Sequence, residues 1–134
     1  ARAAVPGMRR RGGGHIVFVS SIATVGVGGE AAYSASKAGL RAFAAALRHD
    51  VAGDRIGVTT VFPGAVDTPF FERGGRRYDR RFPRMLRPDA VARRVVRAVE
   101  RDRAEVFVPA WLSLAARVHG VAPEVFHRLA GRFG

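Results

Sequence analysis

The 134-residue chain contains no cysteine and only one lysine. Without cysteine, a disulfide framework and a thiolate metal site are excluded. The four histidines (His15, His49, His119 and His127) are scattered, and no two of them have the spacing of paired metal ligands. No apolar stretch is as long as a membrane span, and residues 1–14 lack the apolar core of a signal peptide. We therefore expect a cytoplasmic protein without a bound metal.

Acidic residues are also scarce, so 23 basic residues against 11 acidic ones give a net charge of +12. Such a charge raises the hypothesis of nucleic-acid binding. The arginines are spread along the chain, however, with one dense stretch from Arg73 to Arg87 that includes Tyr78 and Phe82. No nucleic-acid-binding motif accompanies this stretch. It is interpreted first as a solvated loop, then as a loop that receives an anionic substrate group, and last as a nucleic-acid surface.

The hydrophobic pattern predicts one α/β domain at most, because strand-type runs alternate with helical segments. Expected strands are 15–20, 56–62 and 105–108, and expected helices are 30–52, 88–101, 111–118 and 123–132. Residues 1–14 are interpreted as the end of a helix with a Gly-rich turn, and 21–29 and 63–86 as loops. Parallel strands joined by right-handed crossovers follow from this alternation.

The single lysine, Lys37, stands four residues after Tyr33. On a helix these positions share one face, so the phenol and the ammonium group point into the same space. The ammonium stabilises a phenolate and makes Tyr33 a better proton donor. Arginine serves everywhere else in this chain, and a compact ammonium is not interchangeable with a planar guanidinium in a tight site. An exposed Tyr/Lys pair of this spacing is also common on helix surfaces. The neighbouring segments must therefore distinguish a catalytic pair from an ordinary surface pair.

Those neighbours are a strand that ends in Ser20-Ser21 and a second strand that runs into Pro63-Gly64-Ala65-Val66-Asp67-Thr68. Together with Tyr33-x-x-x-Lys37, these segments resemble the short-chain dehydrogenase/reductase family over residues 14 to about 70. The resemblance implies the C-terminal half of a doubly wound, Rossmann-type parallel sheet, with about three strands and flanking helices. Residues 1–134 would then be a partial single domain, the catalytic half of a reductase.

The family's cofactor-binding half has no counterpart here. No Gly-x-x-x-Gly-x-Gly motif follows a first strand, and the catalytic asparagine of the family has no matching position. The segment Gly26-Val27-Gly28-Gly29-Glu30-Ala31 fits Gly-x-Gly-x-x-Gly/Ala, but five residues separate it from the preceding strand. A dinucleotide fingerprint begins directly at a strand end. These glycines are therefore expected to let the loop fold over the active site.

The resemblance implies an NAD- or NADP-dependent oxidoreductase acting on a secondary alcohol or a ketone. Tyr33 would be the general acid/base, and Lys37 would assist it and bind the nicotinamide ribose. Pro63, Gly64, Val66 and Thr68 would line the nicotinamide. The complete protein would be a homo-oligomer that binds a small alcohol or ketone, with an anionic substrate as one option, and neither nucleic acid nor a membrane span is expected.

Two serines compete for the role of orienting the substrate oxygen. The usual spacing in the family, thirteen residues before the tyrosine, selects Ser20, whereas alignment on the strand selects Ser21. Loops absorb deletions more readily than strands do, which favours Ser21 and leaves Ser20 as the alternative. Two other functions stay open: an inactive fragment or oligomerisation partner of the same fold and, less favoured, a basic nucleic-acid-binding protein.

Overall fold

A computed structural model of the protein describes residues 1, 3–75, 78 and 83–130. The strands are β1 (Gly14–Val19), β2 (Ile56–Pro63) and β3 (Glu105–Val108). The helices are α1 (Ala4–Arg10), the 3₁₀ helix η1 (Ile22–Val25), α2 (Ala31–Asp50), α3 (Phe70–Arg73), α4 (Pro88–Glu100), α5 (Leu112–Val121) and α6 (Pro123–Ala130). The predicted α/β class with three strands is confirmed.

Two of the predicted loops contain short helices. η1 lies within the expected loop 21–29, where Ser21 caps it by accepting a hydrogen bond from the Ala23 amide at 3.1 Å. α3 lies within the expected loop 63–86 and follows Pro69, whose fixed φ of −62° suits the start of a helix. The middle of the Arg-rich stretch and the expected end of the last helix lie outside the described residues.

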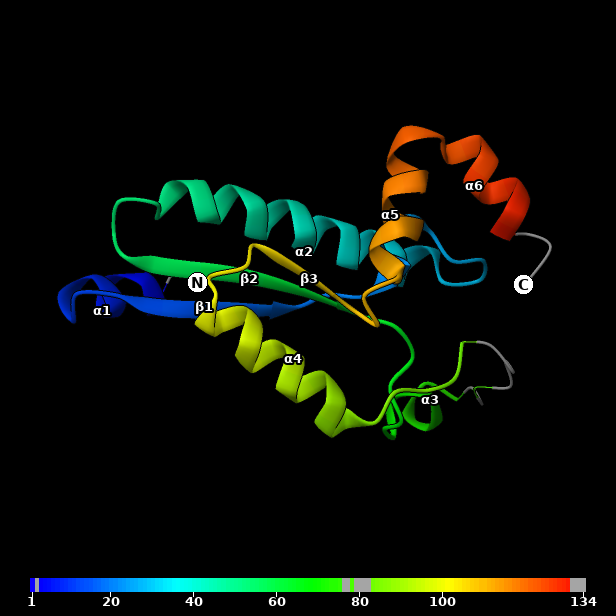
Figure 1. The fold of residues 1–134 in the computed structure, drawn as a ribbon, viewed down its shortest axis with the longest axis horizontal. Helices are drawn as coiled ribbons and strands as arrows, with labels where there is room; N and C mark the ends of the chain where they lie inside the picture. Colours follow the sequence, from blue (N-terminus) through cyan, green and yellow to red (C-terminus); the bar gives the residue numbers. More distant parts are fainter. Residues whose placement is uncertain (2, 76–77, 79–82, 131–134) are drawn as a thin grey trace.

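The sheet has the order β1-β2-β3, and both pairs are parallel. Helix α2 covers one face of the sheet and α4 lies on the other face (Figure 1). The central strand β2 is covered on both faces, and Phe62 has no exposed surface. This explains why β2 has no charged residue and no alternation of apolar and polar residues, with Thr59 and Thr60 also buried.

The main apolar cluster lies between the sheet and the helices α1 and α2. Val5 of α1 and Ala44 and Val51 of the α2 segment meet Ile56 and Val58 of β2. Partly buried side chains of Met8, Ile16, Phe18 and Leu47 extend this cluster. Burial of these side chains fixes α2 along the sheet, and so it fixes where the first turns of α2 lie.

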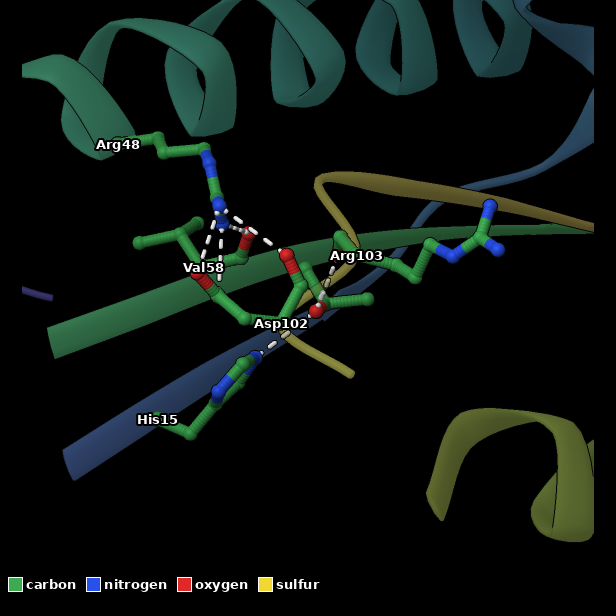
Figure 2. Close-up of polar contacts among 6 residues, drawn as sticks. His15, Arg48, Val58, Asp102 and Arg103 are labelled. Carbon is green, nitrogen blue, oxygen red and sulfur yellow. Dashed lines mark hydrogen bonds and ion pairs between the residues drawn. The ribbon is translucent and has the colours of Figure 1, made fainter. Parts of the chain in front are cut away.

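A polar network lies at the end of the sheet where the strands begin (Figure 2). Arg48 of α2 donates to both carboxylate oxygens of Asp102, at 3.1 and 2.9 Å, and to the carbonyl oxygens of Val58 and Asp102. The Thr59 hydroxyl donates to the Arg103 carbonyl at 2.7 Å, so the His15 Nε2–H must donate to Thr59 Oγ1, 2.8 Å away. The network ties α2, β1 and β2 to the turn before β3.

Burial is the main cause that lowers the pKa of His15 in this network. The hydrogen bond from Arg48 is the main cause that lowers the pKa of the Asp102 carboxyl. Both groups lie at the amino ends of the strands, away from the candidate site.

The other end of the sheet, to which the strands point, is covered by η1, α3 and the α5–α6 pair (Figure 1). Leu112 at the start of α5 is buried there, and rings of His119, Phe126 and His127 join α5 to α6. No group of three or more potential metal ligands occurs among the described residues. Among the helices of the described part, none has the length and apolarity to cross a membrane.

Candidate active site

A cavity of about 450 Å³ opens at the carboxyl ends of β1 and β2. In parallel α/β sheets, ligands bind at this edge. The lining includes every site residue expected from the sequence: Ser20, Ser21, Tyr33, Lys37, Pro63, Gly64, Val66 and Thr68. These residues come from three separate segments of the chain, and the parallel pairing of β1 with β2 brings the segments together.

Tyr33 and Lys37 occupy successive turns at the start of α2. The Lys37 Nζ lies 5.6 Å from the centroid of the Tyr33 ring and donates a hydrogen bond of 3.0 Å to the Val19 carbonyl. An ammonium group carries three donors, so two remain for a ligand in the cavity. The Tyr33 hydroxyl makes no hydrogen bond with any residue the structure describes, which leaves its proton available to a bound molecule.

The two serines differ in where their hydroxyl protons go. Ser20 is only 2% exposed, and its Oγ donates to the Lys37 carbonyl at 3.0 Å. Ser21 is half-buried, and its Oγ accepts from the Ala23 amide, a bond that leaves the hydroxyl proton uncommitted among the described residues. Ser20 therefore ties β1 to α2, whereas Ser21 can donate into the cavity.

The Gly-rich loop between η1 and α2 borders the same cavity through Val27 and Glu30. The loop is fixed to α2 because the amide of Val27 donates to the buried Ser34 Oγ at 3.2 Å. Gly26 and Gly29 adopt φ angles of +82° and +72°, which favour glycine strongly. Because η1 separates β1 from this loop, the glycines do not sit at a strand end, where a dinucleotide fingerprint would begin.

The segment that follows β2 forms the opposite wall. The Gly64 amide donates to the Val108 carbonyl at 2.8 Å, and a Cβ at Gly64 would approach Leu112 Cδ1 to 3.3 Å. Val66 forms an isolated parallel bridge with Leu86. These contacts anchor the wall to β3, to α5 and to the returning end of the Arg-rich stretch.

Sequence reasoning missed the aromatic residues at this site. Phe70 and Phe71 of α3 and Tyr78 line the cavity. Ring centroids lie 5.8 Å apart for Tyr33 and Phe70, 5.4 Å for Phe70 and Phe71, and 5.2 Å for Phe71 and Tyr78. The signal that could have revealed them is the Phe-Phe pair directly after Thr68-Pro69, which lies within the expected loop 63–86.

A second cavity of about 700 Å³ adjoins the first. It shares Tyr33, Thr68, Phe70 and Phe71 with the first cavity. Of the predicted Arg-rich stretch, Arg73 lines this second cavity.

Comparisons with known proteins agree on one family. The model of the short chain dehydrogenase family matches residues 1–78. A dehydrogenase/reductase SDR family protein 7-like from Drosophila melanogaster is 35% identical over 115 residues, which are 80% of this chain and 35% of that protein. An uncharacterized oxidoreductase from Myxococcus xanthus is 34% identical over 131 residues, 97% of this chain and 50% of that protein. This chain thus spans half or less of these relatives' length.

Among solved structures, a short-chain dehydrogenase from Burkholderia cenocepacia in complex with NADP is similar to this chain. The two are 29% identical with a TM-score of 0.77, and the match covers 95% of this chain and 51% of the solved one. The sheet and its flanking helices are therefore those of half of a known fold.

Proposed function

Because this chain belongs to the short-chain dehydrogenase/reductase family, we propose that it is the catalytic portion of an NAD(P)-dependent oxidoreductase that interconverts a secondary alcohol and a ketone. One observation carries this proposal. Ser21, Tyr33 and Lys37 converge with the Pro63–Thr68 segment on a single cavity at the carboxyl ends of β1 and β2. That arrangement combines a proton donor, a cation beside it and a hydroxyl donor in one site.

The residues present fit a nicotinamide and its ribose. The cavity volume of about 450 Å³ lies within the usual range for small-molecule sites. The two remaining donors of Lys37 Nζ suit ribose hydroxyls, and Pro63, Gly64, Val66 and Thr68 offer a largely apolar wall for the ring. NADP in the Burkholderia cenocepacia relative supports this class of nucleotide. We assign the rest of the nucleotide to a glycine-rich segment outside these 134 residues.

A bound nicotinamide would supply the hydride in reduction or accept it in oxidation. Tyr33 donates its phenolic proton to the carbonyl oxygen in reduction and removes a proton from the alcohol in oxidation. The Lys37 ammonium, 5.6 Å from the ring centroid, stabilises the phenolate that forms. Ser21 donates a hydrogen bond to the same substrate oxygen and so stabilises the charge that develops there.

The first test is a titration of the full-length protein with NADH and NADPH, followed by assays of Tyr33→Phe and Lys37→Arg. Tyr33→Phe should abolish turnover and leave nucleotide binding nearly intact, because only the acidic proton is lost. Lys37→Arg should also lose most of its activity. Tyr78→Phe is a comparison within the same cavity: it removes the hydroxyl of the only other tyrosine, which donates to the Pro83 carbonyl, and should lower kcat far less than Tyr33→Phe does. Near-normal kcat in Tyr33→Phe or Lys37→Arg contradicts the assignment.

The Arg-rich stretch adds a test of substrate charge. Arg73 lines the second cavity beside the candidate site. If the arginines from Arg73 to Arg87 receive an anionic substrate group, KM should rise steeply with ionic strength, because salt screens exposed charges beyond about 8 Å. A KM that does not change with salt identifies the stretch as a solvated loop.

A further inference from the structure

The second cavity is lined mainly by apolar groups. Its walls are the start of α2, with Ala31 and Ala32, and the segment from Pro69 to Gly74 that contains α3. The polar side chains among its lining are those of Glu30, Tyr33, Thr68 and Arg73. Its volume of about 700 Å³ is more than a small ketone needs. Its chemistry suits an apolar group.

Phe70 lies where the two cavities meet. The centroid of its ring is 5.8 Å from that of Tyr33 and 5.4 Å from that of Phe71, and the residue is 55% exposed. Phe70 and Phe71 line both cavities. An apolar wall therefore runs without a break from the proton donor Tyr33 into the second cavity. An apolar ligand that covers such an exposed aromatic ring gains favourable burial.

We propose that the substrate of this site is a ketone or secondary alcohol with a long apolar chain that passes Phe70 into the second cavity. This inference rests on the proposed function, because the reacting carbon must lie beside Tyr33. The first cavity would hold the nicotinamide and the reacting group, and the chain would extend into the adjoining second cavity. The Phe70 and Phe71 rings and the Ala31 and Ala32 methyl groups then contact the chain.

The test is a homologous series of methyl ketones, from 2-butanone to 2-dodecanone, assayed with NADPH and NADH in the full-length protein. Each methylene that leaves water for an apolar wall should raise kcat/KM about fourfold. This rise should continue along the series until the chain fills the second cavity, and then level off.

Two variants test the path of the chain. Phe70→Ala should reduce the dependence of kcat/KM on chain length, because it removes the shared wall. Phe43→Ala is the matched control: Phe43 is 51% exposed on α2, packs edge-on against Phe18 and lines neither cavity, so chain-length dependence should not change. Ala32→Leu places a larger side chain in the second cavity and keeps a good helix former. In this variant, kcat/KM should stop rising at a shorter ketone than in the wild type.

The outcomes separate the two proposals. Reduction of the ketones with no dependence on chain length overturns this inference and leaves the proposed function standing. The inference is also overturned if kcat/KM rises with chain length in the wild type and Ala32→Leu does not change this rise. This result holds even if Phe70→Ala fails to fold. No reduction of any ketone with either nucleotide overturns the proposed function, and the inference falls with it.

Discussion

Replacing Ser20 and Ser21 separately with alanine distinguishes a structural hydroxyl from a catalytic one. Ser20→Ala removes a buried hydrogen bond of 3.0 Å to the Lys37 carbonyl, and a bond of this kind contributes about 1 kcal/mol to stability. Ser21→Ala removes the cap that accepts from the Ala23 amide at 3.1 Å, and lost caps typically cost about 1 kcal/mol. The two variants are therefore matched in expected stability.

Their catalytic effects should differ. The Ser21 hydroxyl proton is uncommitted among the described residues and can reach an oxygen in the cavity. Loss of one such donor to a developing oxyanion lowers kcat about 10²- to 10³-fold. The Ser20 proton is already bound to the Lys37 carbonyl, so Ser20→Ala should keep most of its kcat. Steady-state assays of the full-length protein, with thermal unfolding measured in parallel, make the comparison.

Two results would refute this argument. In one, kcat falls 100-fold or more in Ser20→Ala but not in Ser21→Ala. The donor would then be Ser20, the serine thirteen residues before Tyr33. In the other, both variants lose kcat equally at equal stability, which would mean that the hydrogen-bond partners do not separate the roles. Ser21→Thr keeps a hydroxyl and should recover part of the activity.

Three further predictions follow from the fold. The pKa of His15 is lowered mainly by burial and that of Asp102 mainly by the Arg48 hydrogen bond. Stability should therefore be full above about pH 6.5 and fall on acidification, first through His15 and then, below about pH 4, through Asp102. Urea midpoints of the full-length protein across this range test the prediction, and constant midpoints would contradict it. Gly57→Ala should cost about 1–3 kcal/mol, because its Cβ would overlap the His15 ring and lie 2.8 Å from Asp102 Oδ1. Gly39→Ala, in open space on α2, should instead gain up to about 1 kcal/mol, and equal unfolding free energies for the two variants would count against this explanation. The 134 residues expressed alone should aggregate and lack dehydrogenase activity, because β1 pairs only with β2 in the described sheet and leaves an apolar edge. Size-exclusion and calorimetric assays test this. A monodisperse product that unfolds cooperatively and binds NADPH would disprove it.

The elements that sequence patterns predicted are those with long local signals. Runs of β-branched residues predicted all three strands to within a residue or so, and the Ala-rich segment predicted α2. The positions of Tyr33, Lys37 and the Pro63–Thr68 segment followed from motif order, and one cavity brings them together. The parallel pairing of β1 and β2 makes this possible, because it aligns their carboxyl ends.

Features that depend on short signals or distant contacts were not predicted. η1 and α3 are only four residues long each, too short for a hydrophobic period to be visible. The His15–Thr59 and Arg48–Asp102 contacts join residues 44 and 54 positions apart. The second cavity arises because α3 packs beside the start of α2, and no local pattern of residues encodes that contact.

Lys37 shows why one position needed lysine in a chain that otherwise uses arginine. Its Nζ donates to the Val19 carbonyl at the end of β1, and its own carbonyl accepts from the Ser20 hydroxyl just beyond that strand. Two bonds of opposite direction thus tie one turn of α2 to the end of β1. A guanidinium is wider and planar, so we expect an arginine here to fill the space beside the Tyr33 ring if it bonds Val19. We therefore expect that positive charge alone does not meet the requirement at this position, and that a compact group with three donors does.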